Sequence, residues 1–348
     1  MPVTGGKRLN NRPKPVTLAD IAREAGVSTG TVSRALSDGS LVNQATRERI
    51  RIIAEAHNYA PNLFARNLRT RKAGAIAVVI PLGHEREQHL SDPFFAMMLG
   101  YLADELAKRG DDLLLSRVIP SNSNWLGRYI NSGRIDGIIV IGQSNQSDAL
   151  DKASDHYMPL VVWGARRPHQ RYCTVGSDNR LGGLLATVHL FEHGCKSLAF
   201  IGDPTPPEIE QRLEGCRAGC IAVGMSADVQ VIPAHLTADL AYAAVMEFLA
   251  KGNIPDGFVA ASDVIAMAAL RAFGEYGIAV PGRVKITGYD DLGFASHTSP
   301  PLTSVQQDLE QSAAHLVDLV YRRAAGEATE SVVLAPKLVA RESTGVPE

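Results

Sequence analysis

Helical spacing of apolar residues begins at Leu18 and breaks off at Gly26. Thr17 is a favourable N-cap for this segment, and Asp20 three residues later completes a capping-box pattern. Gly26 has no Cβ, so it suits the tight turn that must follow. The pattern therefore predicts a short helix that ends in a turn.

A second short helix is predicted after Ser28, with Val32 and Leu36 turned inward. A third begins near Asn43, and its apolar residues keep helical spacing as far as His57. Two helices joined by a short glycine turn form the geometry that places the second helix in a DNA major groove. Spacing alone also leaves a generic three-helix bundle open.

From residue 75 onward the pattern alternates between strands and helices. Strand-type apolar runs occupy 75–80, 113–118, 138–141, 160–163, 198–201, 229–232, 258–260, 284–288, 332–334 and 338–340. Helical patterns occupy 93–109, 125–131, 149–156, 179–193, 210–223, 238–251, 264–276 and 309–325. Such alternation predicts parallel sheets covered by helices, and two runs of it predict two doubly wound subdomains.

Charge is distributed unevenly over the 348 residues. Residues 1–72 hold 13 Lys and Arg against 5 Asp and Glu, whereas the other 276 residues hold 22 against 32. A basic head on an acidic body indicates a head that meets phosphate. A solvated basic tail would explain only Lys7, Arg8, Arg12 and Lys14, because the other basic residues lie on helical patterns.

The composition is that of a globular protein, with 45% hydrophobic and 21% charged residues. No apolar stretch approaches the roughly 18 residues of a membrane span, and residues 1–15 lack the apolar core of a secretory signal. The four cysteines, Cys173, Cys195, Cys216 and Cys220, are too few for a disulfide framework. We therefore expect a cytoplasmic protein with reduced thiols and with no metal, no cofactor and no membrane partner.

Motifs of common enzymes are missing from the body. The loop after the first strand lacks G-x-G-x-x-G, no G-x-x-x-x-G-K-[ST] loop occurs, and residues 142–146 lack the second glycine of a nucleophile elbow. His84 and His89 flank two glutamates without H-E-x-x-H spacing, as is typical of solvated surface. Binding without catalysis is the expected role of the body.

Four runs in the head occur together in register: 16–28 (VTLADIAREAGVS), 31–36 (TVSRAL), 47–50 (RERI) and 58–62 (NYAPN). With them the chain resembles the LacI/GalR family of bacterial transcriptional regulators, and the resemblance extends more loosely to about residue 343. It implies a helix-turn-helix DNA-binding head and a hinge. It also implies an α/β core whose two doubly wound parallel-sheet subdomains are like those of periplasmic binding proteins.

On this basis we expect a basic disordered tail at 1–15, a helix-turn-helix domain at 16–60 and a hinge at 61–73. The N-terminal core subdomain is expected at 74–175 plus about 306–334, and the C-terminal core subdomain at 176–305 plus about 335–343. No sustained heptad follows the last helix, so no tetramerising coiled coil is predicted.

The family pattern places Thr29, Gly30 and Arg34 on the groove-facing side of the second helix. Arg34 has the chemistry for bidentate contact with guanine O6 and N7. Gly30 departs from the family's larger side chain, which leaves the base specified there open. The other head residues expected at or beside the DNA backbone are Thr17, Ser28, Thr31, Ser33, Asn43, Thr46 and Tyr59.

Pro61 ends the third predicted helix, and Asn62 can cap the segment 63–69 that follows. So short a helix is marginal in water, which suits a segment that folds on DNA and melts away from it. The resemblance implies paired hinge helices in the minor groove, with Leu68 wedged between base pairs and Ala65 one turn before it. The alternative is that Leu68 packs on the core.

The resemblance also implies a ligand site between the two core subdomains. It assigns a clamping arginine to Arg212 and a hydroxyl-accepting carboxylate to Asp290, an opposed pair that suits a polyol. The other expected effector-binding residues are Phe94, Phe95, Trp163, His235, Leu236, Ser262 and Gln307. Core packing is an equal alternative for one of the two phenylalanines.

One departure concerns the residues after the strand at 160–162. The family often carries an aspartate there, whereas this chain reads Trp163-Gly164-Ala165. A lost carboxylate and a gained indole favour stacking, and with Trp125 near another loop they favour an oligosaccharide or glycoside. The alternative is that Trp163 ends a strand and packs.

The sequence thus predicts a homodimeric repressor that binds a palindromic double-stranded operator and is released by a sugar bound in the core. A regulator that uses a purine or phosphosugar as corepressor is the first alternative. A sugar-processing enzyme with an accessory DNA-binding head is the second.

Overall fold

The computed structural model describes residues 16–36, 42–59, 72–82 and 88–345. The chain forms two compact units, Met1–Ala73 and Gly74–Glu348. Unit 1, the head, contains helices α1 (Leu18–Glu24), α2 (Thr29–Leu36) and α3 (Gln44–Ala56). Unit 2, the core, contains two six-stranded sheets. The predicted fold class, an all-α head and an α/β core of two wound sheets, is confirmed.

The helix starts in the head follow the predicted caps. The Thr17 side chain accepts a hydrogen bond from the Asp20 amide, and the Asp20 carboxylate accepts one from the Thr17 amide, so the capping box is complete. Gly26 adopts a positive φ of 65° in the turn, where a side chain would be strained. Apolar residues from all three helices then pack into one small core: Ile21, Ala22, Ala25, Val32, Ala35, Val42 and Ile50.

The first lobe of the core is built on a parallel sheet. Its strands are β1 (Ala75–Pro81), β2 (Asp112–Val118), β3 (Gly137–Ile141), β4 (Leu160–Trp163), β5 (Cys173–Ser177) and β11 (Val332–Leu334). Their order is β11-β5-β4-β3-β1-β2, and every neighbouring pair is parallel. Its helices are α5 (Pro93–Ala107), α6 (Gly127–Ile130), α7 (Ser147–Ser154) and α12 (Leu309–Ala324).

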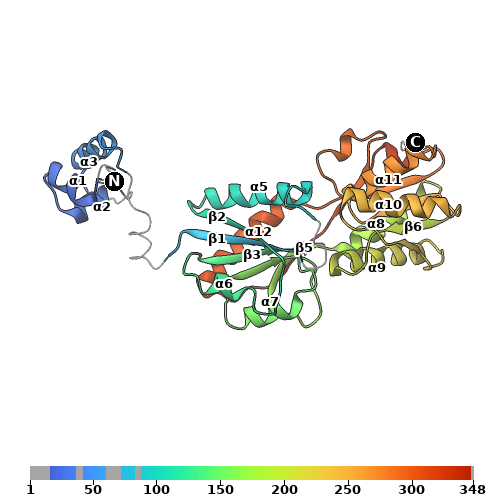
Figure 1. Ribbon diagram of the computed structural model, residues 1–348, viewed down its shortest axis with the longest axis horizontal. Coiled ribbons are helices and arrows are strands. Elements are labelled where there is room, and N and C mark those ends of the chain that lie inside the picture. The colour runs from blue at the N-terminus through green and yellow to red at the C-terminus, as the bar shows by residue number, and fades with distance from the viewer. Residues whose placement is uncertain (1–15, 37–41, 60–71, 83–87, 346–348) are drawn as a thin grey trace, which may run out of the picture. The chain divides into compact units, whose positions relative to one another are not determined.

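Both faces of this sheet are covered (Figure 1). Along β1, Ile76, Val78 and Ile80 join the core that contains α5 and α12, whereas Ala77 and Val79 join the core that contains α6 and α7. Alternate side chains of a strand point to opposite faces, so a strand buried on both faces is apolar throughout. The uninterrupted apolar run at 75–80 has this cause.

The second lobe repeats the plan. Its strands are β6 (Leu198–Ile201), β7 (Gln230–Ile232), β8 (Gly257–Ala260), β9 (Lys285–Asp290), β10 (Thr303–Gln306) and β12 (Lys337–Val339). Their order is β12-β10-β9-β8-β6-β7, parallel except that β12 runs antiparallel to β10. Its helices are α8 (Asn179–Glu192), α9 (Pro207–Ala222), α10 (Ala238–Ala250) and α11 (Asp263–Glu275).

The chain passes between the lobes three times. It leaves the first sheet after β5, returns after β10 through α12, and leaves again between β11 and β12. Because the chain crosses and recrosses, neither lobe is one continuous segment.

Several element predictions were wrong in detail. β5 and β10 were not predicted, because residues such as Thr174 and Ser304 are polar although they are buried. The helix expected at 125–131 is only the short α6, and α9 begins at Pro207, three residues before the predicted start. Trp125, an expected aromatic subsite, packs instead in the core of the first lobe.

Other expectations concern membranes, thiols and metals. None of the helices in the described residues combines the length and apolar character of a membrane-spanning segment. The four cysteines are free and buried. No group of three or more potential metal-ligating side chains gathers in that same part of the chain.

Helices α8 and α9 pack closely through glycines. A Cβ at Gly183 would overlap the carbonyl of Arg212, and a Cβ at Gly215 would overlap the carbonyl of Arg180. The two backbones approach this closely only because neither position carries a side chain. This packing fixes the helix that carries Arg212.

The substitution Gly215→Ala is expected to lower the free energy of unfolding by about 1–3 kcal/mol, the usual cost of overpacking. The matched control is Gly274→Ala in α11, where a Cβ would meet nothing within 4 Å. There alanine stabilises the helix by up to about 1 kcal/mol. Urea denaturation measures both variants, and a Gly215→Ala variant as stable as the wild type would contradict the close packing.

Candidate functional site

The outward side of α2 carries the residues expected to read DNA. Thr29, Gly30 and Arg34 are all exposed, while Val32 and Ala35 on the other side are buried. A Cβ at Gly30 would lie 3.8 Å from Nη2 of Arg34. The missing side chain at Gly30 therefore leaves open space beside the Arg34 guanidinium.

Three expected backbone-contacting residues serve as helix caps. Oγ1 of Thr17 accepts from the Asp20 amide at 3.3 Å, Oγ of Ser28 accepts from the Thr31 amide at 3.1 Å, and Oδ1 of Asn43 accepts from the Thr46 amide at 2.8 Å. These bonds pin the first turn of each helix.

The remaining expected head residues divide by burial. Thr31 and Ser33 are half-buried, and Thr31 also bonds the Ser28 hydroxyl at 2.9 Å. Tyr59 packs against the head core, and burial raises the pKa of its phenol. The expected hinge residues Asn62, Ala65 and Leu68 lie outside the described residues.

In the core, one pocket lies between the lobes at the carboxyl ends of their strands. Its lining includes Leu82 after β1, Gly142 after β3, Ser262 after β8 and Gln307 after β10. It encloses about 760 Å³ of space free of protein atoms, part of it open to solvent. This position is that of a small-molecule site in a wound α/β fold.

Nearly all the expected effector-binding residues meet in this pocket. Those that line it are Phe94, Phe95, Trp163, Arg212, Leu236, Ser262, Asp290 and Gln307. His235 is different, because it is exposed and does not line the pocket although its neighbour Leu236 does. Alternate residues of an extended segment point in opposite directions, so only one of this pair can face inward.

Sequence reasoning missed several lining residues, among them Gln88, Asp92, Ser144 and Glu208. Two signals were available. Ser144 follows a parallel strand at its carboxyl end, where such sites lie. Glu208 precedes Arg212 by four residues in α9, so the two side chains share a helix face.

Aromatic rings form one wall of the pocket. The Phe94 ring lies 4.9 Å from that of Trp163 and 5.7 Å from that of Phe95, measured between centroids. Trp163 is 6% exposed, and its indole Nε1 has no hydrogen-bond partner among the described residues. The wall thus offers flat apolar faces and one unused donor.

Arg212 is held in place before any ligand binds. Its Nε donates to Oδ1 of Asn179 at 2.9 Å and its Nη1 donates to the Ala261 carbonyl at 2.5 Å. The guanidinium also lies 3.6 Å from the centroid of the Tyr289 ring. A cation fixed in this way presents its charge in one direction, which favours specific recognition.

Asp290 is the buried carboxylate of the second lobe. Nε2 of Gln307 donates to its Oδ1 at 2.6 Å, and Oε1 of Gln307 is buried without a partner in the described part of the chain. Asp290 adopts a positive φ of 108°, which is rare for a residue with a side chain. Burial raises the pKa of Asp290 to about 7, against the opposing effects of Arg212 and the Gln307 bond.

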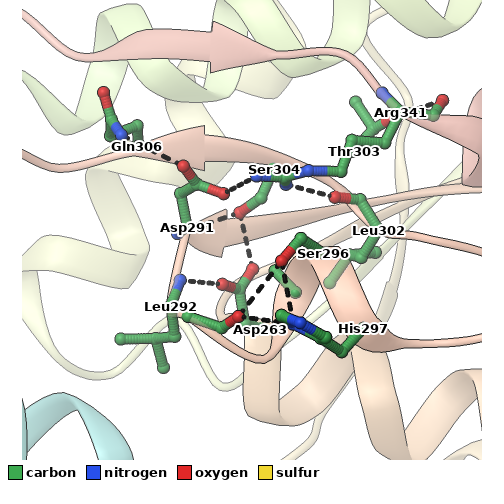
Figure 2. A network of polar contacts seen from close by, with 12 residues as sticks. Asp263, Asp291, Leu292, Ser296, His297, Leu302, Thr303, Ser304, Gln306 and Arg341 are labelled. Carbon is green, nitrogen blue, oxygen red and sulfur yellow. Dashed lines mark hydrogen bonds and ion pairs between the residues drawn. The ribbon is translucent and has the colours of Figure 1, made fainter.

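A polar network joins residues that are next to some of these ligand-facing groups in the chain (Figure 2). Oδ1 of the fully buried Asp263 accepts from the Ser304 hydroxyl at 2.5 Å, and its Oδ2 accepts from the Leu292 amide at 2.7 Å. Arg341 pairs with Asp291 at 2.7 Å, and Gln306 donates to Asp291 at 3.1 Å.

Three of the network residues each neighbour a pocket residue in the chain. Asp263 follows Ser262, Asp291 follows Asp290, and Gln306 precedes Gln307. The network therefore ties together the start of α11, the end of β9 and the end of β10. Three pocket side chains from separate segments are positioned by one set of bonds.

The charge of the pocket is predominantly acidic. Asp92, Glu208 and Asp290 line it, and Arg212 is the only Lys or Arg among the lining residues that the structure describes. An anionic ligand would meet these carboxylates in a partly desolvated site, where repulsion is strong. Hydroxyl groups fit better, because each can donate to a carboxylate and accept from Arg212 or Trp163.

Two family descriptions match the chain. "Bacterial regulatory proteins, lacI family" matches residues 17–62, and "Periplasmic binding protein-like domain" matches residues 187–344. The first match spans the three head helices. The second spans most of the second lobe together with the returning α12, β11 and β12.

Two relatives match over almost the whole chain. The HTH-type transcriptional regulator CelR of Thermobifida fusca is 33% identical over 343 residues, which are 96% of this chain and 100% of CelR. The HTH-type transcriptional repressor PurR of Pasteurella multocida is 29% identical over 338 residues, which are 94% of this chain and 98% of PurR.

Solved structures of regulators also match almost the whole chain. A CelR–cellobiose complex has a TM-score of 0.69 and 32% identity, and the match covers 94% of this chain and 99% of CelR. The Lac repressor dimer bound to operator and an anti-inducer has a TM-score of 0.82 at 24% identity, covering 96% and 100%. The likeness to the Lac repressor is one of fold.

The raised pKa of Asp290 predicts a pH-dependent stability. Its folded-state pKa of about 7 lies above its usual value of 3.8. The folded chain therefore holds a proton that the unfolded chain releases, and stability falls as pH rises between these two values. Asp290→Asn keeps the acceptor for Gln307 and tolerates positive φ, but cannot ionise.

Effector-free Asp290→Asn is expected to melt above the wild type at pH 8, with the difference vanishing towards pH 4. Differential scanning fluorimetry from pH 4 to 8 measures this. A difference in Tm that is the same across the whole range would mean that ionisation of Asp290 is not its cause.

Proposed function

Because the chain belongs to the LacI family of bacterial regulatory proteins, we propose that it is a transcriptional repressor controlled by a small molecule. The head binds double-stranded operator DNA, and the pocket of the core binds the effector. Ligand binding shifts the equilibrium between DNA-binding and released forms, to the extent that the two forms differ in affinity for the ligand. No catalytic step is assigned to any residue.

The DNA-binding part of the proposal is supported by the surface of α2. Arg34 is exposed beside the space left by Gly30, so its guanidinium can extend to a guanine edge in the major groove. Caps at Thr17, Ser28 and Asn43 hold the first turns in place. Phosphate contacts there would set register, and Arg34 would carry sequence preference.

A homodimer on a palindromic operator is proposed for the whole protein. A helix-turn-helix head reads only a half-site. Two heads that bind one symmetric duplex together therefore bind it more tightly than a single head does. The solved Lac repressor of the same fold is a dimer bound to its operator. In the same arrangement, Leu68 of each hinge would wedge into the minor groove at the centre.

For the effector we propose a neutral polyhydroxylated molecule, a mono- or oligosaccharide or glycoside. The observation that carries this is the composition of the pocket. It opposes the Phe94 and Trp163 rings to Arg212 and Asp290, which suits the apolar face and hydroxyl edge of a sugar ring. The relative CelR is known in complex with cellobiose. Release from the operator, rather than corepression, is the proposed response.

A purine corepressor is the second candidate, and PurR among the relatives favours it. A purine is also flat and could stack on the face of an aromatic ring that lines the pocket. A phosphosugar is disfavoured, because its phosphate would face Asp92, Glu208 and Asp290 with only Arg212 to balance them.

The experiment is fluorescence anisotropy on palindromic duplexes from the region upstream of the gene, at about 150 mM salt, where screening suppresses loose attraction. Scrambled competitor DNA is present throughout. We expect competitor-resistant binding that one sugar of a panel containing cellobiose reverses. Binding strengthened by hypoxanthine or guanine would favour the second candidate. Weak binding, equally sensitive to salt on all duplexes, would overturn the repressor proposal.

The head itself can be tested by Arg34→Ala. Losing one bidentate base contact should reduce discrimination at one base pair by about 1–3 kcal/mol while leaving non-specific binding nearly unchanged. Competition with single-base operator variants measures this. The matched control is Arg51→Ala, which removes an exposed arginine on α3 that pairs with Glu55. Equal loss on specific and scrambled DNA would mean that Arg34 contacts phosphate only.

A further inference from the structure

One carboxylate of the pocket also bonds to the opposite lobe. Glu208 lies in the first turn of α9 in the second lobe and is 8% exposed. Its Oε1 accepts from the Ala165 amide at 3.0 Å and from Nε2 of Gln143 at 3.3 Å. Ala165 follows β4 and Gln143 follows β3, so both donors belong to the first lobe.

The first lobe holds these donors in a fixed orientation. Gln143 is fully buried, and its Oε1 accepts from the Tyr172 hydroxyl at 2.6 Å. Its Nε2 also donates to the Ala165 carbonyl. Since the Ala165 carbonyl and the Glu208 carboxylate can only accept, the amide of Gln143 is oriented with Nε2 towards them.

A glycine makes room for the contact. A Cβ at Gly164 would lie 2.5 Å from Nε2 of Gln143 and 2.7 Å from Oε1 of Glu208. Any larger residue between Trp163 and Ala165 would displace the carboxylate. Gly164 thus leaves the space into which Glu208 reaches from the other lobe.

Only half of the carboxylate is used in this way. Both bonds end on Oε1, and no hydrogen bond to Oε2 occurs among the described residues. Glu208 lines the same pocket as Arg212, one helical turn further along α9. A carboxylate taken out of water is costly unless its oxygens are paired, so a ligand that leaves Oε2 without a donor is penalised.

We propose that Glu208 is a specificity-determining residue that joins effector recognition to the position of the lobes. Oε1 holds the first lobe through Ala165 and Gln143, and Oε2 accepts from the effector. The effector must therefore present a hydroxyl or ammonium donor at this point. The inference rests on the proposed function for its effector half, whereas the bridge between lobes stands without any ligand.

Three variants separate the bridge between the lobes from the bond to the effector. Glu208→Ala removes both interactions. Glu208→Gln keeps an oxygen for the Ala165 amide but turns an NH₂ donor towards the ligand. Gly164→Ala keeps the carboxylate and displaces it from the bridge. The control is Glu210→Gln, an exposed acid in the same turn of α9.

The first measurement uses the full-length protein without effector. Hydrogen–deuterium exchange, read on overlapping peptides that isolate the buried Ala165 amide, reports the bridge. We expect exchange about tenfold faster in Glu208→Ala and Gly164→Ala, and near wild type in Glu208→Gln and the control. β4 should stay protected in all four. Unchanged protection of Ala165 in Glu208→Ala would overturn the proposal.

The second measurement is titration calorimetry with whichever compound of the sugar and purine panel acts on the wild-type complex with operator. Glu208→Gln should lose about 10- to 100-fold in affinity, the effect of losing a hydrogen bond to a charged group, and the control should lose none. Full affinity in Glu208→Gln would overturn the effector half. If no compound acts, the effector part of the proposed function fails, while the exchange result still decides the bridge.

Discussion

The buried carboxyl group of Asp263 is the interaction on which the ligand-facing edge of the second lobe depends. It begins α11 and bonds both Ser304 in β10 and the Leu292 amide after β9. Burial raises its pKa well above the usual range, and the bonds from Ser304 and Leu292 oppose that rise. A Cβ at Gly288 would overlap Oδ1 of Asp263, so β9 passes close behind it. Because these segments are distant in sequence, the bonds between them set the relative positions of Ser262, Asp290 and Gln307.

The pocket combines two kinds of contribution. The first lobe supplies mainly faces, the rings of Phe94, Phe95 and Trp163, which bind by area. The second lobe supplies oriented polar groups: Arg212, which is held by Asn179, and Asp290, which is held by Gln307. A site assembled in this way from two lobes is complete only when they face each other. Glu208, which bonds across the gap, makes the same arrangement part of the empty protein.

The head reaches rigidity by other means. Its core is small, so side-chain caps rather than extensive burial define where each helix begins. Such caps bind backbone amides and leave the outer face of α2 free for Arg34. Unit 2, in contrast, buries both faces of two sheets. The difference suits a small unit that presents one surface to DNA and a large unit that encloses a ligand.

Local sequence was enough to specify the elements that depend on near neighbours. Thr17 with Asp20, and Gly26 after them, specified the head helices, because capping and turns act within a few residues. Uninterrupted apolar runs specified the central strands, and resemblance to a family located Arg212 and Asp290. The remaining features depend on contacts between residues that are distant in the sequence. β5 and β10 are strands although they contain polar residues, because these side chains have partners, such as Gln170 for Thr174 and Asp263 for Ser304. Likewise Trp125 packs in the hydrophobic core of the first lobe, and Glu208 accepts a hydrogen bond from Ala165, which is 43 positions away in the chain. Periodicity reports which face of an element is apolar, but it carries no information about which distant residue will lie opposite.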